Sequence, residues 1–504
     1  MKKVFIFFTS VLLISLFSLS AYENDIIIKT EPVEFKEVQF SHFERIKTSL
    51  SREEFEKDLE SLCYLLSTGY AGYEDMIKNG FSIMSFEQNI LDKFESKETI
   101  NSRDFYFSLK EGLKPYINDS HFIIAHFTDL YSFSTRKFCA WSDIFMRKEK
   151  DDYFVTESNV PYISANDKFT DEKQYLFYYP VKGKNIYRLG FLTEKGAAIQ
   201  KDFSFNNKTI SVPLKMDGAI ERRPMKFKDF STKDSAYIEL NDFMRPEAGS
   251  PQKMAAEIIF NKFINLGQKY NDKKNIILDL RSNSGGLTEM PLAFFFSLYT
   301  NKNYKDTDTI IERLSNWNHE SFFESTQILS PAYYQILAQY EESRNNIPGK
   351  MFADSKITTQ KQKPERIVVK NILKPSKLFS RGSKFKGKLI ILTDRNTVSA
   401  GEGAILFAKQ IFGNDNVYTV GENTYGMAEY WNVFDVQLPN SKINIHTSFS
   451  RNETMRKNEQ WHGEGTGLYP DYWCTGCDLN ETIFMITEDE EMKEKLKNIE
   501  FYLL

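Results

Sequence analysis

Ser399 is the residue of this sequence best placed to act as a nucleophile. An apolar run at residues 389–392 predicts a buried strand, a polar turn covers residues 393–397, and apolar residues recur at helical spacing after Ser399. The serine therefore stands where a strand gives way to a helix. Free backbone N–H groups and the dipole at a helix N-terminus favour negative charge. The oxyanion that forms when a serine hydroxyl attacks a carbonyl carbon is such a charge.

The same placement also fits a purely structural role. Serine is a common helix N-cap residue. The Gly-x-Ser-x-Gly pattern of many hydrolases is absent, because Thr397 occupies the position of its first glycine. On this stretch alone the cap is the favoured interpretation, so the choice depends on the rest of the chain.

Strand and helix patterns alternate around Ser399. Strand patterns occupy residues 235–240, 275–280 and 417–420, and helix patterns occupy residues 251–270 and 290–299. Such alternation predicts crossover units, and hence an α/β domain over residues 231–504.

Two further regions precede this domain. Helix patterns and a capping box at residues 51–54 predict a helical region over residues 21–130, which ends in a strand directly after a Ser-His pair. Short strand patterns separated by Gly, Asn and Lys predict a β-rich domain over residues 131–230. Residues 303–385 are polar and irregular, and we expect them to form an excursion from the core.

The composition is that of an ordinary globular protein. The chain has 504 residues, of which 41% are hydrophobic and 27% charged, and its net charge is −4. This length gives ample core for two or three domains. The near-neutral charge gives no indication of a nucleic-acid partner.

Residues 1–20 have the features of a secretory signal peptide. Two lysines precede an apolar run at residues 4–17, and small residues follow it, so we expect cleavage near Ser20 or Ala21. An uncleaved anchor is the alternative, but the run is short for a membrane span. No later stretch is long and apolar enough to span a bilayer. We therefore expect an exported protein (periplasmic, in the cell envelope or extracellular) without a stable membrane span after cleavage.

The four cysteines give little support for a metal site. Cys474 and Cys477 have the spacing of a redox or metal pair, whereas Cys63 and Cys139 stand alone. No second close pair exists to complete a zinc site. A local disulfide between Cys474 and Cys477, or two free thiols, is favoured over a metal site.

Four segments together resemble the tail-specific (C-terminal processing) and tricorn-core serine peptidase family. They are residues 279–286, 396–402, 421–426 and 467–471, in that order along the chain. Each segment alone is a weak signal, but four in the right order make chance agreement improbable. The resemblance implies a crotonase-like α/β core, a helical N-terminal region and a β-rich inserted domain in the place of a PDZ domain.

The sequence departs from the tail-specific branch of this family. That branch uses a lysine directly after Thr-x-Gly, and here Met427 occupies the position and cannot accept a proton. The tricorn-like branch uses Ser, His, a second Ser and Glu. The resemblance to it implies Ser399 as nucleophile, His121 as general base and Glu464 as the carboxylate of the relay, with Ser120 beside them.

Elementary chemistry agrees with these roles. A serine hydroxyl needs a neighbour that takes its proton near neutral pH, which suits a neutral imidazole, and the imidazole needs an acceptor that fixes its tautomer. The resemblance places the oxyanion hole at the N–H of Ala400 and one N–H of the pair Gly285 and Gly286, where the lack of side chains lets a substrate approach.

Several charged or titratable residues near these motifs also fit structural roles. His462 lies near Glu464 in sequence and is a second candidate for the base, ranked below His121. His126 fits an ordinary strand residue. Three further charged residues beside the motifs are expected to hold turns through ion pairs or hydrogen bonds, namely Asp279, Arg281 and Glu402.

The resemblance implies a serine peptidase that acts on peptides or proteins through an acyl-enzyme, without a metal or other cofactor. The rival interpretation is a catalytically silent binding protein for apolar ligands or peptides, which 43 Phe and 26 Tyr would suit. The complete Ser–His–Glu set argues against it, because a binding protein needs none of the three. Residues 131–230 contain no convincing PDZ pattern, so selectivity for C-terminal tails is not predicted.

Overall fold

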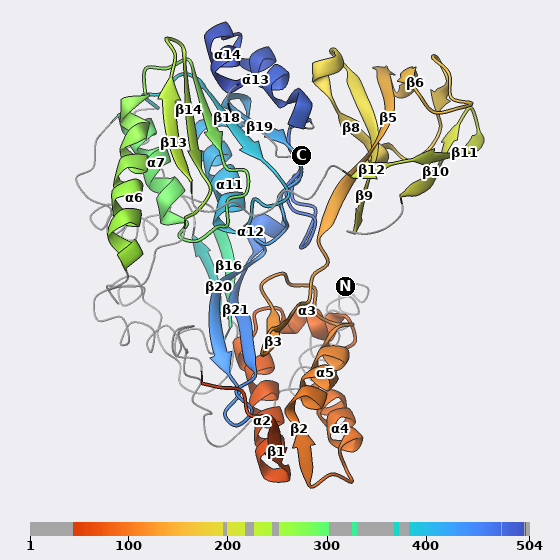
Figure 1. Ribbon diagram of the computed structural model, residues 1–504, viewed down its shortest axis with the longest axis vertical. Coiled ribbons are helices and arrows are strands. Elements are labelled where there is room, and N and C mark those ends of the chain that lie inside the picture. Colours follow the sequence, from red (N-terminus) through yellow and green to blue (C-terminus); the bar gives the residue numbers. More distant parts are fainter. Residues whose placement is uncertain are drawn as a thin grey trace, which may run out of the picture. The chain divides into compact units, whose positions relative to one another are not determined.

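A computed structural model describes residues 44–194, 199–216, 226–243, 251–301, 325–330, 367–371, 383–474, 476–497 and 499. The predicted signal peptide and most of the predicted excursion at residues 303–385 lie outside these residues. The chain divides into two compact units (Figure 1). The first contains residues 1–134, 326–369 and 430–453, and the second contains residues 135–325, 370–429 and 454–504. No helix among the described residues is long and apolar enough to cross a membrane.

The first unit combines helices with a sheet whose strands come from distant parts of the sequence. Its helices are α2 (Arg52–Tyr64), α3 (Tyr73–Lys78), α4 (Ile83–Lys93) and α5 (Ser102–Leu113), with a π-helical turn at Leu65–Gly69. The predicted capping box is confirmed, because Ser51 Oγ accepts the Glu54 N–H and Glu54 Oε2 accepts the Ser51 N–H at 2.9 Å. A short two-stranded antiparallel sheet is formed by β1 (Ser49–Ser51) and β2 (Thr99–Asn101), between which α2, α3 and α4 lie in the sequence.

The sheet of this unit joins segments that are far apart in the sequence. Its strand order is β17 (Ile367–Asn371), β16 (Ser325–Leu329), β21 (Asn444–Asn452), β3 (Ile123–His126) and β4 (Asp129–Ser132), and β20 (Tyr430–Gln437) pairs with β21. The strand predicted after the Ser-His pair is therefore β3, and it is antiparallel to β21. This pairing groups residues 430–453 with the N-terminal helices, whereas the predicted boundaries assigned them to the domain at residues 231–504.

The second unit begins with an antiparallel sheet. Its strands are β5 (Lys137–Glu149), β6 (Asp152–Ser158), β7 (Lys168–Phe169), β8 (Leu176–Tyr178), β9 (Ile186–Glu194), β10 (Gln200–Phe205), β11 (Lys208–Pro213) and β12 (Lys215–Met216). The predicted β-rich character of this region is confirmed. A 3-10 turn at Lys173–Tyr175 precedes β8.

The six-stranded sheet of the second unit carries the motifs. Its order is β13 (Phe227–Ser231), β14 (Ser235–Leu240), β15 (Asn275–Asp279), β18 (Lys388–Thr393), β19 (Val417–Gly421) and β22 (Tyr472–Trp473). β13 is antiparallel to β14, and the other neighbours are parallel. Parallel strands need crossover connections, which α6 (Pro251–Lys269), α7 (Glu289–Thr300) and α11 (Ala400–Phe412) provide (Figure 1). The mixed α/β fold is as predicted, and the crotonase-like core stays a prediction.

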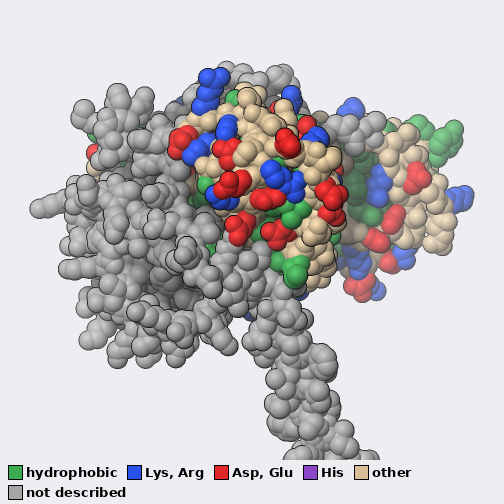
Figure 2. Space-filling view, turned by 90° about the horizontal axis from the view of Figure 1, so that it is seen from below, with side chains coloured by type: hydrophobic (Ala, Val, Ile, Leu, Met, Phe, Trp, Pro, Cys, Tyr) green, Lys and Arg blue, Asp and Glu red, His purple; other side chains and the backbone are tan. Residues whose placement is uncertain are grey.

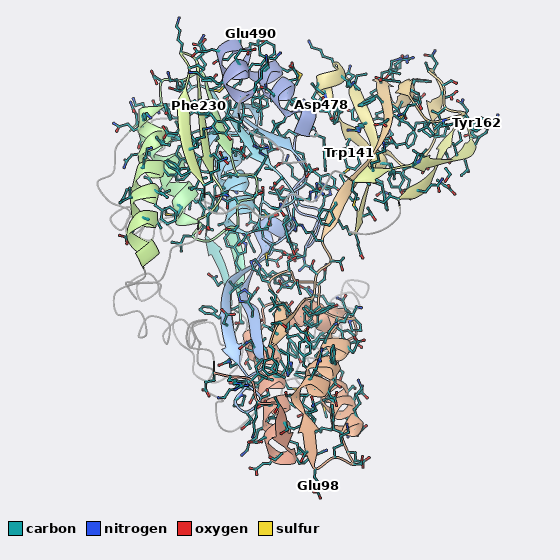
Figure 3. The ribbon with its side chains drawn as sticks, in the orientation of Figure 1. Glu98, Trp141, Tyr162, Phe230, Asp478 and Glu490 are labelled. Atoms are coloured by element: carbon teal, nitrogen blue, oxygen red, sulfur yellow. The ribbon has the colours of Figure 1, made fainter. Side chains whose placement is uncertain are left out.

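Two C-terminal helices, α13 (Leu479–Thr487) and α14 (Glu490–Lys497), cover one face of this parallel sheet. Their apolar residues form one core with Ile277, Ile390 and Val420. Trp141 of β5, labelled in Figure 3, joins the same core, and its ring centroid lies 5.7 Å from that of Trp473. The antiparallel sheet is therefore packed directly against the parallel one.

The surface of the first unit pairs neighbouring charges of opposite sign. Ion pairs of this kind include Lys47 with Glu54, Arg52 with Glu56 and Lys57 with Glu53. On the face viewed in Figure 2, acidic and basic side chains are interspersed among the described residues. Such exposed pairs contribute little to stability, because solvent screens the attraction between their charges.

Candidate active site

Ser399 stands between the end of β18 and the start of α11, as the sequence predicted. The turn before it is held by side chains. Asp394 Oδ1 accepts the Ser282 N–H at 2.8 Å and the Asn396 N–H at 2.9 Å. Thr397 Oγ1 donates to the Leu280 carbonyl at 2.9 Å. These bonds fasten the serine turn to the loop that follows β15.

The backbone of Ser399 distinguishes it from the ordinary N-cap residues of this chain. Its φ is 51° and its ψ is −114°. The N-caps Ser51 and Ser82 have φ of −67° and −123° with ψ of 164° and 121°, in the extended region usual for caps. A positive φ is uncommon for a residue with a side chain, and it is held only where the surroundings enforce it. A strained turn between a strand and a helix is how nucleophilic serines are presented in hydrolases that carry a nucleophile elbow.

The loop after β15 brings two glycines to the serine turn. A Cβ added to Gly285 would lie 2.9 Å from Ser399 Cβ and 2.9 Å from the Val398 carbonyl oxygen. The φ of Gly285 is +77°, so both space and conformation require glycine there. Its N–H is already donated to Asn283 Oδ1 at 2.9 Å. This loop therefore passes in direct contact with the nucleophile turn.

Two backbone N–H groups remain available beside Ser399. Gly286 is exposed, and its N–H has no hydrogen-bond partner among the described residues. The Ala400 N–H, the first of α11, also has none among them, and the Ala400 nitrogen lies 3.3 Å from the position of a Gly285 Cβ. Of the two predicted glycine donors, Gly286 is thus the one whose N–H is free.

Glu402 connects the serine turn to the loop that follows β19. Its carboxylate is fully buried. It accepts hydrogen bonds from the N–H groups of Ser399, Gly426 and Met427 and from the hydroxyl of Thr424. The expected role of Glu402 in holding the turn is confirmed. Burial raises the pKa of Glu402 to about 7, although the four hydrogen bonds favour its charged form.

Asp279 and Arg281 form a buried ion pair at the end of β15, as predicted. Arg281 Nε lies 2.9 Å from Asp279 Oδ1, and Arg281 Nη2 lies 2.5 Å from Asp279 Oδ2. The Tyr237 hydroxyl donates to Asp279 Oδ2 at 2.7 Å. Burial alone would raise the pKa of Asp279, but the Arg281 charge and these hydrogen bonds lower it below its usual range.

We expect Arg281→Met to destabilise the protein by about 3–5 kcal/mol, because it leaves the Asp279 charge buried without its ion-pair partner. A urea titration followed by tryptophan fluorescence measures this change. The double variant Asp279→Asn/Arg281→Met removes both charges and should recover part of the loss. A single variant that unfolds at the same urea concentration as the wild type would contradict a structural role for the pair.

Glu464 lies in the second unit, the unit that also contains the serine turn. It is buried, and its Oε1 accepts the Glu429 N–H at 2.8 Å. Burial is the main cause that raises the pKa of Tyr425, and the charge of Glu464 raises it further. Tyr425 directly follows Thr424, whose hydroxyl donates to Glu402. Two residues on from Glu464, the Thr466 carbonyl accepts a hydrogen bond from Asn423 Nδ2.

His121 and Ser120 belong to the first unit. His121 is buried, and its Nδ1 has no hydrogen-bond partner among the described residues. Its N–H donates to Asp119 Oδ1 at 2.7 Å. Burial is the main cause that lowers the pKa of His121 to about 3, and nearby His446 lowers it further. The ring is therefore neutral, which is the form of a general base. Its pairing with Ser399 and Glu464 in the second unit stays a prediction.

Two other histidines have identifiable partners. A ring nitrogen of His126 lies 2.9 Å from Ser102 Oγ, and His126 is the last residue of β3, as expected of a strand residue. The ring of His462 is stacked on Tyr469 with centroids 3.4 Å apart. Burial lowers the pKa of His462.

The sequence analysis missed a third histidine. His446 Nδ1 lies 2.9 Å from Asp435 Oδ1 across the β20–β21 pair, and its ring centroid is 6.5 Å from that of His121. The sequence pattern that could have revealed this pair is the β20–β21 hairpin. Two antiparallel strands around a turn at residues 438–443 place residues 435 and 446 opposite each other. Arg136 was also missed; its guanidinium lies over the Tyr425 ring, 4.4 Å from the centroid, and donates to Asn396.

Cys474 is a buried free thiol, and burial raises its pKa. This favours the free-thiol alternative over a disulfide to Cys477, whose side chain lies outside the described residues. Among the residues that the structure describes, no group of three or more His, Cys, Asp and Glu side chains could hold a metal ion.

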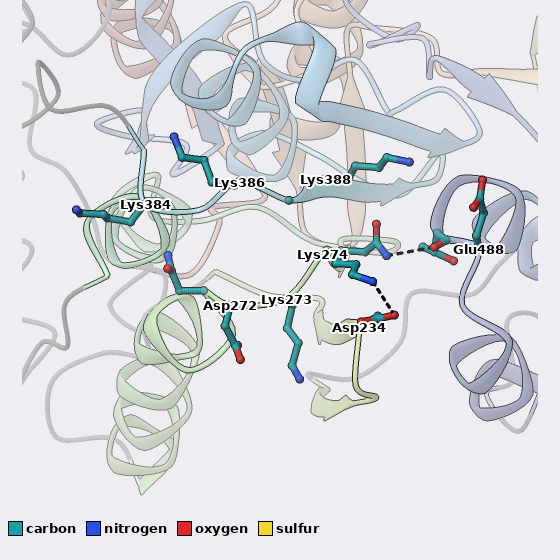
Figure 4. Close-up of a pocket in the computed structure, with 12 residues that line it drawn as sticks. Asp234, Asp272, Lys273, Lys274, Lys384, Lys386, Lys388 and Glu488 are labelled. Atoms are coloured by element: carbon teal, nitrogen blue, oxygen red, sulfur yellow. Dashed lines mark hydrogen bonds and ion pairs between the residues drawn. The ribbon is translucent and has the colours of Figure 1, made fainter.

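A polar pocket of about 700 Å³ lies at the opposite end of the parallel sheet. It is lined by residues at the amino ends of β15 and β18, including Asn275 and Lys388, whereas the serine turn and the glycine loop follow the carboxyl ends. Five lysines line it, but Figure 4 shows their side chains pointing in different directions. Lys274 pairs with Asp234, and Lys388 donates to the Ile486 carbonyl. The pocket is therefore not the candidate site.

The model of Peptidase family S41 matches residues 234–473. This range contains Ser399, Gly286, Glu402 and Glu464 with the sheet that carries them, and it leaves out His121. The match supports a serine-type peptidase, which is a hydrolase, as the sequence analysis predicted. It does not distinguish the branches of the family, so the Ser-His-Ser-Glu assignment stays a prediction. No curated protein matches the chain.

Several solved structures resemble the chain at low identity. Mature CPAF complexed with lactacystin is 13% identical, with 88% of this chain and 97% of that chain covered and a TM-score of 0.40. The photosystem II D1 C-terminal processing protease is 13% identical, with 84% and 93% covered and a TM-score of 0.32. The tricorn protease is 12% identical, with 88% and 37% covered and a TM-score of 0.33. At these TM-scores none of the likenesses enters the argument.

Proposed function

We propose that this protein is an exported serine peptidase that hydrolyses peptide bonds through an acyl-enzyme on Ser399, with His121 as general base. The observation that carries the proposal is the backbone of Ser399. Its φ of 51° at a strand–helix junction is unlike the capping serines of the same chain. Available N–H groups of Gly286 and Ala400 lie beside it, within the range matched by the S41 peptidase family.

The chemistry follows from these groups. Ser399 Oγ would attack the carbonyl carbon of the scissile peptide bond while His121 takes its proton. The negative charge on the carbonyl oxygen would be stabilised by the Ala400 N–H at the start of α11 and by the Gly286 N–H on the loop after β15. Collapse of this intermediate breaks the C–N bond, and the amine leaves with the proton from His121. Water then attacks the ester carbonyl carbon while His121 takes its proton, and the C–O bond to Ser399 breaks as His121 returns the proton to Ser399 Oγ.

The properties of His121 support its assignment as base. Burial lowers the pKa of the ring to about 3 and so keeps it neutral at neutral pH. A base of such low pKa accepts a proton only where a carboxylate stabilises the charged ring, which is the role proposed for Glu464. A buried Nδ1 without a partner among the described residues is a costly feature unless a substrate-bound or assembled site provides one. Met427 stands where a lysine base would otherwise be expected, and its N–H is taken by Glu402. Glu464 is proposed to stabilise the protonated ring directly or through Ser120.

Two further parts of the proposal are export, which rests on the sequence, and a crotonase-like core, which rests on the strand pairing. Residues 1–20 support export, and export would bring the protein to the periplasm, cell envelope or exterior. The strand order and parallel pairing of β14, β15, β18 and β19 support a crotonase-like core. Peptides or proteins are the substrate class that a peptidase of this family would take.

A serine-directed fluorophosphonate probe tests the proposal. The mature protein should react with it stoichiometrically, and prior incubation with a chelator should leave the reaction unchanged. Absence of reaction in a folded, mature protein would favour the rival interpretation, a silent binding protein.

A further inference from the structure

We propose that Glu402 is a positioning residue that holds Ser399 in its reactive conformation only while its carboxylate is ionised, so that it makes the enzyme sensitive to pH. This inference rests on the proposed function of Ser399. It goes beyond a structural role for Glu402, because it predicts a change in nucleophile reactivity without unfolding.

The geometry of the carboxylate supports this role. Oε2 accepts the Ser399 N–H at 3.0 Å and the Met427 N–H at 2.8 Å. Oε1 accepts the Thr424 hydroxyl at 2.5 Å and the Gly426 N–H at 2.9 Å. All four neighbours are donors, and an ionised carboxylate is the one side-chain group of this shape that only accepts.

The Thr424 hydroxyl extends the contact to a third segment. Its oxygen accepts the Leu468 N–H at 2.7 Å, so it cannot reorient without losing a bond. Gly467 packs against the same threonine, since a Cβ added there would lie 2.3 Å from Thr424 Oγ1. Glu402 therefore connects the serine turn, the loop after β19 and the loop after Glu464. The proposed reaction needs these three segments in fixed positions relative to one another.

Protonation would weaken this arrangement. A neutral carboxyl group carries an O–H that needs an acceptor, and among the four neighbours only the Thr424 hydroxyl can accept it, by giving up its own donation to Oε1. The bond from the Ser399 N–H then loses its charge assistance. This bond opposes the return of a strained φ of 51° toward the extended region, so its weakening allows the turn to relax.

The surroundings place the titration in an accessible range. Burial raises the pKa of Glu402 to about 7, against the effect of the four hydrogen bonds. Tyr425 is the titratable neighbour that feels the Glu402 charge; its pKa is raised by burial and by Glu464 and Glu402, and lowered by Arg136. Tyr425 stays neutral in the same pH range. His121 is neutral throughout it as well, because burial lowers its pKa to about 3.

The experiment compares the rate of fluorophosphonate labelling between pH 5 and 9 for the wild type, Glu402→Gln and Glu459→Gln. Glu459 is an exposed glutamate of the same unit and serves as the matched control. The wild type and Glu459→Gln should lose labelling rate below an apparent pKa of about 7. The Glu402→Gln variant places an amide NH2 against two donors. Its rate of fluorophosphonate labelling should therefore fall about 100-fold at pH 8, and the loss of labelling rate below pH 7 should disappear. A Glu402→Gln rate and profile equal to the wild type would overturn the inference.

Thr424→Val provides a second variant that keeps the carboxylate, in case Glu402→Gln does not fold. The Thr424 hydrogen bond lowers the pKa of Glu402. Its removal should therefore shift the loss of labelling to higher pH. An unchanged profile in folded Thr424→Val would contradict the inference. Wild-type labelling that is absent, or that survives Ser399→Ala, would instead refute the proposed function itself.

Discussion

Replacement of Ser399 by alanine is expected to abolish peptide hydrolysis while leaving the fold intact. The change removes the only atom proposed to form the covalent bond to the substrate, and triad deletions in serine proteases cost roughly 10⁴- to 10⁶-fold in kcat. Alanine keeps the Cβ, so the contact with the Gly285 loop is preserved. Steady-state hydrolysis of a denatured protein substrate measures the loss, and circular dichroism checks the fold.

The outcome also separates the two interpretations of Ser399. A serine that acts only as a helix cap would, when replaced by alanine, cost about 1 kcal/mol of stability and little activity. Normal turnover by a folded Ser399→Ala variant would therefore leave the cap as its role.

His121→Ala is expected to have the second largest effect, a loss of several orders of magnitude in kcat. Without a base, the serine hydroxyl must lose its proton to water. His462→Ala is the matched control and should retain near-normal turnover, because its ring is stacked on Tyr469 at the surface. If His462→Ala is inactive and His121→Ala is not, the base is misassigned and the tricorn-like interpretation fails.

The pH dependence gives the His121 assignment a further consequence. The pKa of His121 is lowered to about 3, so in the free enzyme its protonation should not limit kcat/KM above about pH 5. The sequence alone suggested a limit near 6.5, the ordinary value for histidine. The lowered pKa also carries a stability effect. The contribution of the neutral buried ring is present above about pH 6.5 and is lost as the pH falls toward 3.

Elements with a strong local pattern were predictable. β14 has the predicted bounds, β15 ends one residue earlier than predicted, and α7 extends one residue beyond the prediction at each end. Their apolar residues recur at the spacing of one structure only, and Gly or polar turns bound them. The placement of Ser399 between β18 and α11 followed from the same patterns.

Features that depend on long-range pairing were not predictable. The antiparallel pairing of β3 with β21 joins residues 123–126 to residues 444–446, and nothing local to either strand specifies the partner. The φ of Ser399 is held by contacts with two residues. Gly285 lies on the loop after β15, and Glu402 lies in the first turn of α11. The helix and strand propensities of single residues carry no information on such contacts.

The most direct test of the central claim is to locate the covalent adduct. The mature protein is labelled with a fluorophosphonate, digested and analysed by tandem mass spectrometry. We predict one adduct, on Ser399 in the peptide that spans β18 and α11, and none in the Ser399→Ala variant. An adduct on another residue, or equal labelling of Ser399→Ala, would contradict the assignment of Ser399 as the nucleophile.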